Sequence, residues 1–175
     1  MKIAGESSLS LENTFTSKEL NKLDRFTIFG LLAADQAIEQ ACLHNGKNTD
    51  VGVIIGSGIG GISTFETQHK RLLTHPKKVS PYFIPTMISD IAAGHISIKY
   101  GFKGINYCVV SACATGSHAI GDAYRQIKHG YEKIIVAGGC EAPITPMSIA
   151  GFSNMKALTI NPDINTACRP FDLNR

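Results

Sequence analysis

The sequence has no large excess of charge of either sign and no long uninterrupted apolar run. Lysine and arginine number 17 against 14 aspartates and glutamates, a formal net charge of +3 with histidine neutral. That surplus is too small to indicate a nucleic-acid-binding protein by itself, although an acidic partner stays open. The longest uncharged stretch, residues 104–121, contains polar side chains such as Asn106, Ser111 and His118, which a membrane span would not tolerate. We therefore expect a soluble protein that binds neither nucleic acid nor membrane.

The first ten residues also lack the features of a secretory signal. They contain a single lysine and no apolar core followed by a small-residue cleavage site, so we expect a cytoplasmic protein. The cysteines are odd in number and include no C-x-x-C pair, which indicates neither a disulfide framework nor a zinc cluster. They are Cys42, Cys108, Cys113, Cys140 and Cys168. No metal site is predicted, and at least one thiol is free to do chemistry.

No internal repeat, low-complexity tract or linker divides the chain, so residues 1–175 are expected to form one folded unit. Thr16 and Glu19 resemble a capping box, and apolar residues then recur at helical spacing as far as Asn45-Gly46. This pattern predicts one long amphipathic helix. Further helices are predicted over residues 63–73 and from about residue 88 to Gly101, with an exposed connection around residues 75–81 between them.

Three short apolar runs predict strands, at residues 51–55, 107–111 and 133–137, and the last two are expected to be buried. The last two flank a predicted helix over residues 114–129. A strand–helix–strand crossover makes parallel sheet, so the sequence indicates the α/β class. Cys113 falls in the turn between the second strand and this helix.

The glycines after the first predicted strand allow two interpretations. Gly56, Gly58 and Gly61 match the dinucleotide-binding pattern G-x-G-x-x-G. That pattern also requires an acidic residue about twenty positions further on, and residues 72–78 include none. A tight strand-to-helix turn with closely packed backbone is therefore the stronger hypothesis.

Cys113 is the strongest candidate for chemistry. At the first turn of a helix, unpaired backbone N–H groups point at its sulfur and favour the nucleophilic thiolate. The position resembles the strand–turn–helix elbow of hydrolases, but Ser111 stands where the G-x-S-x-G pattern has its first glycine. A small structural cysteine explains the placement equally well. His118 lies five residues along the same helix and is more simply a structural hydrogen-bonding residue than a base, and the same objection applies to His95.

A set of separated motifs decides between these alternatives. The motifs are Leu23-Asp-Arg-Phe26, Ile55-Gly-Ser-Gly-Ile-Gly-Gly61, Ser80-Pro-Tyr-Phe-Ile-Pro85, Ala93-Gly-His-Ile-Ser97, Val110-Ser-Ala-Cys-Ala-Thr-Gly-Ser-His118, Val136-Ala-Gly-Gly-Cys-Glu-Ala142, Gly151-Phe-Ser153 and Arg169-Pro-Phe-Asp172. Together they resemble the amino-terminal half of β-ketoacyl-[acyl-carrier-protein] synthases, particularly the synthase II type. The resemblance covers nearly the whole chain. It implies a thiolase-like layered α/β fold. This chain would form about the first half of that fold and would be incomplete at both ends relative to the family.

The resemblance implies that Cys113 takes up an acyl chain as a thioester. Decarboxylation of a malonyl group on the carrier protein then makes an enolate, which attacks the thioester and lengthens the chain by two carbons. Residues matching Ile59 and Phe152 line the acyl pocket in this family. Basic residues of the family's carrier-protein docking patch match Lys18, Lys22, Lys77, Lys78 and Lys156, whereas Asn21 departs from the basic residue often found there. No cofactor is expected, because the phosphopantetheine arm belongs to the carrier protein.

The same resemblance implies a homodimer in which residues 106–111 run beside their symmetry mates. The family's two catalytic histidines, a lysine and a phenylalanine-glycine gate lie beyond the part that matches Arg175. We therefore expect a fragment, from an incomplete sequence, a split gene or a decayed gene, with exposed apolar surface and no condensing activity alone. Two alternatives stay open: a polyketide-type ketosynthase, and a non-catalytic product that only binds carrier protein or a partner subunit.

Overall fold

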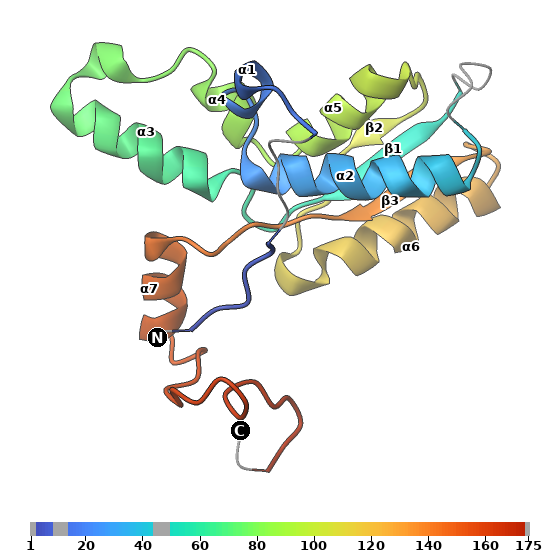
Figure 1. The fold of residues 1–175 in the computed structure, drawn as a ribbon. Helices are drawn as coiled ribbons and strands as arrows, with labels where there is room; N and C mark the ends of the chain where they lie inside the picture. The colour runs from blue at the N-terminus through green and yellow to red at the C-terminus, as the bar shows by residue number, and fades with distance from the viewer. Residues whose placement is uncertain (1–2, 9–13, 44–49, 174–175) are drawn as a thin grey trace. The chain divides into compact units, whose positions relative to one another are not determined.

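The computed structural model describes residues 3–8, 14–43 and 50–173 (Figure 1). The chain divides into two compact units. We call Thr16–Ala142 the sheet unit, and Met1–Phe15 together with Pro143–Arg175 the terminal unit. Cys113 and all the described strands belong to the sheet unit.

A parallel sheet forms the centre of the sheet unit. The described strands are β1 (Gly52–Gly56), β2 (Asn106–Tyr107) and β3 (Ile135–Gly139). Their order is β2-β1-β3, and Val53 pairs with Asn106 on one side and with Val136 on the other. Every residue of β1 is buried, as expected of a central parallel strand covered on both faces. The predicted α/β class and parallel sheet are confirmed.

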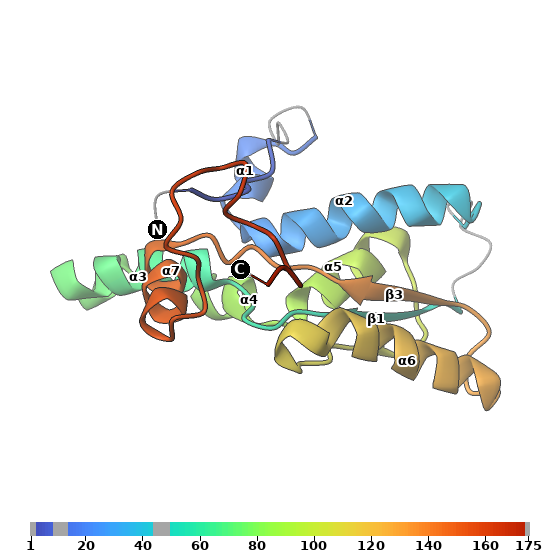
Figure 2. The same cartoon turned by 90° about the horizontal axis from the view of Figure 1, so that it is seen from below.

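Helices cover both faces of this sheet (Figures 1 and 2). They are α2 (Arg25–Gln40) and α5 (Ile91–Tyr100) on one face and α6 (Thr115–Lys128) on the other. Beneath α6, Ile54 packs against Ala119 and Ala123, while Phe26 of α2 and Ile96 of α5 are fully buried. The small alanines let α6 lie close to the sheet. The result is three layers, with helix on both sides of a parallel sheet.

The prediction of one long helix after Thr16 is wrong, because the structure has two helices there. The capping box is confirmed: Thr16 caps α1 (Ser17–Leu20), and its hydrogen bonds to Glu19 lower the pKa of that carboxyl. Helix α1 ends at Leu20, and a second helix begins after Asp24, whose carboxylate caps α2 by accepting from the N–H of Phe26 at 3.3 Å. Asp24 also accepts from the N–H and the hydroxyl of Thr64, 2.8 and 2.7 Å away. This distant partner holds Asp24 outside a continuous helix. The predicted stop at Asn45-Gly46 lies outside the described residues.

The second predicted strand is shorter than expected. Only residues 106–107 pair with β1, and residues 108–111 leave the ladder to enter the turn that carries Cys113. Val110 is 59% exposed, so the predicted burial of this run is also wrong. β3 is confirmed as a strand but is only partly buried, because it lies at an edge of the described sheet.

The other predicted helices are confirmed, with small changes at their ends. They are α3 (Ile62–Thr74), α5 and α6, and the exposed connection after α3 contains the 3-10 turn η1 (Pro76–Lys78) and the short helix α4 (Phe83–Met87). Gly101 ends α5 with φ of 68°, a left-handed conformation that favours glycine. In the described part of the chain, every helix is too short or too polar to traverse a bilayer.

The terminal unit contains helix α7 (Pro146–Asn154). Thr145 caps it by accepting from the N–H of Ser148 at 3.3 Å, and a proline occupies the first turn, where its missing N–H costs nothing. Phe152 lies on α7 and is 38% exposed, and Lys156 follows the end of this helix. The two units are not placed relative to each other.

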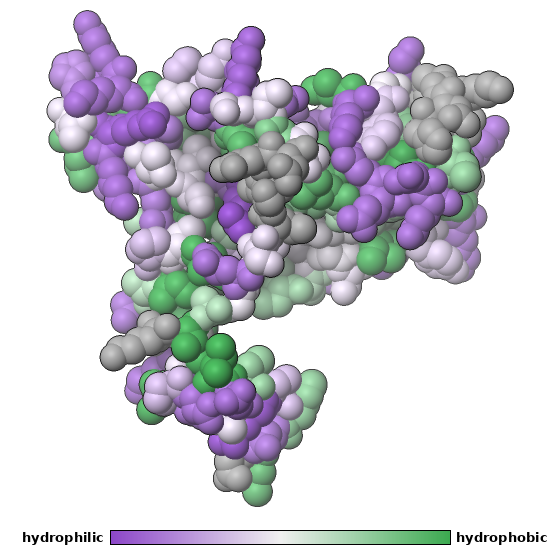
Figure 3. All heavy atoms as spheres, viewed as in Figure 1, coloured by the Kyte–Doolittle hydropathy of each residue, from purple (hydrophilic) through white to green (hydrophobic). Residues whose placement is uncertain are grey.

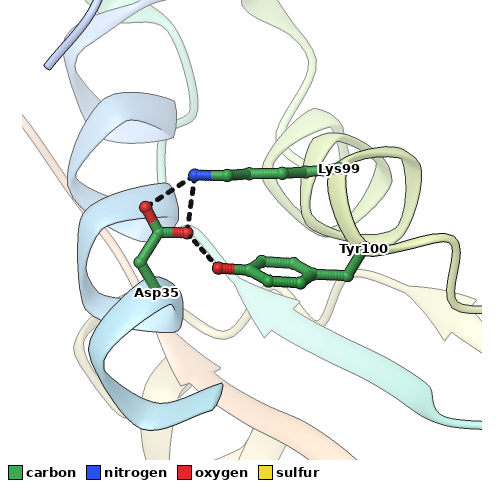
Figure 4. A network of polar contacts seen from close by, with 3 residues as sticks. All are labelled: Asp35, Lys99 and Tyr100. Carbon is green, nitrogen blue, oxygen red and sulfur yellow. Dashed lines mark hydrogen bonds and ion pairs between the residues drawn. The ribbon is translucent and has the colours of Figure 1, made fainter. Parts of the chain in front are cut away.

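A partly exposed polar network joins α2 to α5 in the sheet unit (Figure 4). The Nζ atom of Lys99 lies 2.6 and 2.8 Å from the two carboxylate oxygens of Asp35, and the Tyr100 hydroxyl donates to the same carboxylate at 2.6 Å. Burial raises the pKa of Tyr100, and the hydrogen bond to Asp35 and that carboxylate's charge add to the shift. The network fixes the relative position of the two helices on this face of the sheet.

Tyr100→Phe is expected to lower the free energy of unfolding by about 1 kcal/mol, because one hydrogen bond to a charged acceptor is lost while the ring stays. Since folding raises the tyrosine pKa above its ordinary value, the Tyr100 contribution is present below about pH 10 and declines as the pH rises further. Urea unfolding at neutral pH and at alkaline pH measures both effects. Arg125→Ala is the control, because its ion pair with Asp122 is exposed and should contribute little. If Tyr100→Phe had the same urea midpoint as the unchanged chain, the Tyr100 hydroxyl would not contribute to stability.

Candidate active site

Cys113 lies in a sharp turn between β2 and α6. It is the middle residue of the 3-10 turn η2 (Ala112–Ala114), and this turn directly precedes α6. The Cys113 side chain is exposed. Ala112 has φ of 50°, in the left-handed region that residues with a Cβ rarely adopt. Such strain costs of the order of 1 kcal/mol and persists only where surrounding contacts hold it.

Thr115 provides these contacts. Its buried hydroxyl accepts from the N–H of Ser111 at 2.9 Å and donates to the carbonyl of Ala112 at 2.7 Å, so it closes the turn from inside. The N–H of Ala114 donates to the Ser111 carbonyl at 3.1 Å. Among the described residues, the N–H of Cys113 donates to no acceptor. The turn therefore presents a thiol and an unused N–H together at the amino end of a helix.

Cys113 opens into a cavity of about 290 Å³ at the carboxyl ends of the strands. The cavity is lined by Gly56, Ser57, Gly58, Ala112, Cys113, Thr115, Gly116, Gly139, Cys140 and Glu141. The glycines are needed for close approach: a Cβ on Gly56 would collide with Thr115 Cγ2 and lie 2.9 Å from the Val109 carbonyl. A Cβ on Gly139 would lie 3.0 Å from the Gly116 Cα. Small residues thus bring β1, β3 and α6 together around the thiol.

The glycine-rich loop after β1 is a packed turn, as the stronger of the two hypotheses predicted. The N–H groups of Gly58 and Ile59 donate to Glu141 Oε2 at 2.6 and 3.2 Å. The N–H of Gly60 donates to Ser57 Oγ at 2.9 Å, and that of Gly61 donates to the Met87 carbonyl at 2.9 Å. The amides that a dinucleotide phosphate would need already have partners, which argues against the nucleotide hypothesis.

Neither histidine singled out in the sequence faces Cys113 across this cavity. The Nδ1 atom of His118 lies 2.6 Å from the Ser111 hydroxyl, in agreement with the predicted structural hydrogen bond. His95 lies on α5, and burial lowers its pKa. Within the described residues, the cavity that Cys113 lines contains no histidine. The thiol and its turn are therefore present without a neighbouring base.

The other cysteines have different surroundings. Cys140 borders the same cavity, but burial and the nearby Glu141 carboxylate raise its pKa to about 12. Burial likewise raises the pKa of Cys108. Cys42 and Cys168 are exposed and lie outside the cavity. Of the thiols that border the cavity, only Cys113 is exposed.

Iodoacetamide at about pH 7.5 is expected to alkylate Cys113 at least about tenfold faster than Cys140, because the thiolate is the reacting form and Cys140 stays protonated. Raising the pH should speed Cys140 alkylation as its pKa is approached. Timed quenching followed by peptide mass spectrometry measures each rate, and the unfolded chain is the control, in which the difference should vanish. Equal rates in the folded chain would show that Cys140 is not protected.

Ile59 lines a second, apolar cavity. This cavity, of about 430 Å³, is lined by Ile59, Gly61, Ile62, Phe65, Met87, Ile88 and Ser89, and Ile59 is 40% exposed. Loop residues 57–61 border both this cavity and the cavity of Cys113. Ile59 is thus placed on a short segment that links the thiol to an apolar hollow, whereas Phe152 belongs to the terminal unit.

The basic residues named from the sequence fall in three places. Lys18 and Lys22 line a hollow of about 610 Å³ together with Arg25 and Arg71, which the sequence argument did not single out. Lys77 and Lys78 are exposed in η1, beyond the end of α3, where hydrophilic side chains gather (Figure 3). Lys156 lies in the terminal unit. Lys22 also lies over the Tyr82 ring, with Nζ 5.0 Å from its centre.

Comparisons with known proteins identify the family of the chain. The family model for the beta-ketoacyl synthase N-terminal domain matches residues 5–174. The chain is 47% identical over 177 residues to 3-oxoacyl-[acyl-carrier-protein] synthase 2 of Staphylococcus aureus, which spans 99% of this chain and 44% of that protein. It is 48% identical over 162 residues to the protein of the same name from Synechocystis, across 90% of this chain and 39% of the relative. The chain therefore spans less than half the length of these relatives.

Solved structures show the same fold. A beta-ketoacyl synthase from Burkholderia phymatum superposes with a TM-score of 0.83 at 25% identity, over 95% of this chain and 42% of that one. A ketosynthase of a type II PKS, solved in complex with its acyl-carrier protein, superposes with a TM-score of 0.79 at 23% identity, over 86% of this chain and 44% of that one. The chain belongs to the β-ketoacyl-[acyl-carrier-protein] synthase II family and corresponds to the N-terminal domain of its members.

Proposed function

We propose that Cys113 is the acyl-accepting nucleophile of a decarboxylative condensing enzyme of fatty acid synthesis. The observation that carries the proposal is the exposed Cys113 thiol in a strained, braced turn at the amino end of α6. The helix dipole at the amino end of α6 favours negative charge there, and the N–H of Cys113 donates to no acceptor among the described residues. Sulfur is also a good leaving group, so a thioester formed on it can be passed on.

The chemistry takes two steps in this proposal. The Cys113 thiolate attacks the carbonyl of an acyl thioester on the carrier protein. The new C–S bond to Cys113 forms, the C–S bond to the carrier's pantetheine arm breaks, and the carrier sulfur leaves as a thiolate, which takes a proton from solvent. A malonyl group on a second carrier protein then loses CO2, and the resulting enolate carbon attacks the Cys113 thioester. The bond to Cys113 breaks, which regenerates the thiolate and gives 3-oxoacyl-[acyl-carrier-protein].

The N–H of Cys113 suits the first step. It has no acceptor among the described residues and sits beside the sulfur, so it can donate to the oxygen of a thioester carbonyl as negative charge develops. One such donor contributes about 3 kcal/mol of transition-state stabilisation in comparable sites. The brace from Thr115 keeps this N–H in place before the substrate arrives.

Ile59 and Phe152 are proposed to contact the acyl chain. The apolar cavity beside Ile59 supports this role, because each methylene buried there contributes about 0.8 kcal/mol. Phe152 offers an exposed aromatic side chain on α7. An acyl chain on Cys113 would extend past loop residues 57–61 toward the apolar hollow.

Lys18, Lys22, Lys77, Lys78 and Lys156 are proposed to bind an acidic acyl carrier protein whose phosphopantetheine arm delivers the thioester. The exposed lysines of η1 and the basic hollow around Lys18 and Lys22 support this assignment. Opposite charges steer such encounters and make them sensitive to salt. Homodimer formation through residues 106–111 is part of the same proposal, supported by the edge position of β2 and the exposed Val110.

Acyl transfer from an acyl-[acyl-carrier-protein] with a radiolabelled acyl group tests the proposal. We expect the label to stay on the chain after acid precipitation and to be released by neutral hydroxylamine, as a thioester requires. A chain that acquires no hydroxylamine-labile label would contradict the assignment of Cys113.

The 175 residues alone are not expected to make 3-oxoacyl product when malonyl-[acyl-carrier-protein] is added. Within the described residues, the Cys113 cavity holds no histidine that could assist decarboxylation or bind the enolate oxygen. Loss of one member of a catalytic group costs orders of magnitude, while partial reactions can survive. Product analysis by mass spectrometry, with a complete relative as the positive control, measures this. Condensation at a rate near that of the control would contradict the expectation.

A further inference from the structure

Glu141 occupies a position that acyl transfer to Cys113 does not itself explain. It follows β3 directly, and its carboxylate reaches the loop that follows β1. One oxygen accepts from the N–H groups of Gly58 and Ile59, and the other accepts from the Ser57 hydroxyl at 3.1 Å. Three donors from consecutive residues therefore converge on one side chain that is more than eighty positions away in the sequence.

The contact requires both partners in their present form. A Cβ on Gly58 would lie 2.8 Å from Glu141 Oε2, so only glycine lets the carboxylate come this close. Ser57 is fully buried. Its hydroxyl donates to Glu141 and also accepts from the N–H of Gly60, so it connects the carboxylate to the next part of the loop. Hydrogen bonds to a carboxylate are shorter and stronger than those between neutral groups, and the 2.6 Å bond from Gly58 fits that class.

The location of this contact links the two cavities. Glu141 lines the cavity of Cys113, and Ile59, whose N–H it holds, lines the apolar cavity. A shift of the loop would move Ile59 relative to the thiol without any change at Cys113. The carboxylate therefore holds a segment of the loop that borders both cavities.

We propose that Glu141 is a positioning residue that fixes loop residues 57–60, so that Ile59 meets the acyl chain carried by Cys113. The inference rests on the proposed function of Cys113 and Ile59 and adds the residue that holds their geometry. Its consequence is a change in the ratio of two rates: loosening the loop slows transfer of a long acyl chain, which would contact Ile59, more than it slows transfer of an acetyl group.

The test compares Glu141→Ala and Glu141→Gln with Glu132→Ala. Glu132 is a matched control, because its carboxylate also accepts from a backbone N–H, that of Ile105 at 2.8 Å, but before β2 and β3 and so at the opposite ends of the strands. Circular dichroism and thermal unfolding establish that each variant folds. Glu141→Gln keeps the shape of the side chain and decides the question if Glu141→Ala unfolds.

Hydrogen exchange measures the loop directly. The amides of Gly58, Ile59 and Gly60 are expected to exchange about tenfold faster in the Glu141 variants and at the original rate in Glu132→Ala. Exchange that is unchanged in folded Glu141 variants would overturn the proposal, since the carboxylate would then not hold the loop.

Acylation rates of Cys113 by dodecanoyl- and acetyl-pantetheine measure the consequence. The ratio of the two rates is expected to fall about tenfold in the Glu141 variants and to stay constant in Glu132→Ala, because packing of the longer chain against Ile59 is lost. An unchanged ratio in a chain that is acylated would overturn the positioning role and leave Cys113 as the nucleophile. A chain that neither thioester acylates would overturn the proposed function itself.

Discussion

Cys113→Ala is expected to lower the rate of acyl transfer to the chain by at least about 1000-fold, because the nucleophile is removed and no neighbouring group in its cavity replaces it. Cys140 borders the same cavity, but its pKa of about 12 keeps it protonated at neutral pH. The substitution is small and lies on an exposed turn, so the fold should be retained. Time courses of hydroxylamine-labile label measure the rate.

Cys168→Ala is the matched control for this result, since it removes another exposed thiol that lies outside the cavity. Its rate should equal that of the unchanged chain. Residual labelling of Cys113→Ala at a similar rate would show that the acyl group goes to another nucleophile.

Gly56→Ala is expected to lower the free energy of unfolding by about 3 kcal/mol and to slow acylation of Cys113. The added methyl group would collide with Thr115 Cγ2 and press on the Val109 carbonyl, neither of which is a flexible chain end. Thr115 closes the Cys113 turn, so moving it disturbs the thiol as well as the packing of α6 on β1. Urea unfolding and acylation kinetics on the same sample measure the two effects.

Gly121→Ala is the control, because it is expected to raise the free energy of unfolding instead of lowering it. Gly121 lies within α6, where an added Cβ meets nothing within 4 Å, so alanine should stabilise the helix by about 0.5–1 kcal/mol. If both variants changed stability alike, the close approach at Gly56 would not be the cause of the effect.

Much of the fold could be predicted from local sequence pattern. The capping box at Thr16, strand β1, the helices α3 and α6 and the end of α5 at Gly101 all depend on residues near one another in the chain. Local preferences act there in the same direction as the packing.

The predictions of helix and strand boundaries were wrong where contacts between residues far apart in the sequence determine where an element begins or ends. Asp24 starts a new helix because Thr64, forty positions later, donates twice to its carboxylate. β2 is short because the chain must leave the ladder to form the turn at Ala112. Helical spacing alone shows neither effect, since it carries no information on contacts between separate elements.

The contacts around the candidate site could be predicted only in part, for the same reason. Placement at a strand-to-helix turn indicated Cys113, and the motif resemblance singled it out, whereas the brace from Thr115 and the carboxylate of Glu141 depend on three-dimensional contacts. Both residues lie within the quoted motifs, and the glycine-rich turn after residue 55 indicated closely packed backbone, but neither feature identifies Glu141 as the group that approaches Gly58.

The proposed function requires that one thiol, that of Cys113, accepts the acyl group. Peptide mass spectrometry after brief incubation with acyl-[acyl-carrier-protein] tests it most directly, since each of the five cysteines can be followed separately. We expect the acyl mass on the peptide that contains Cys113 and none on the peptides of Cys42, Cys108, Cys140 and Cys168. An acyl group on any of those four in place of Cys113 would contradict it.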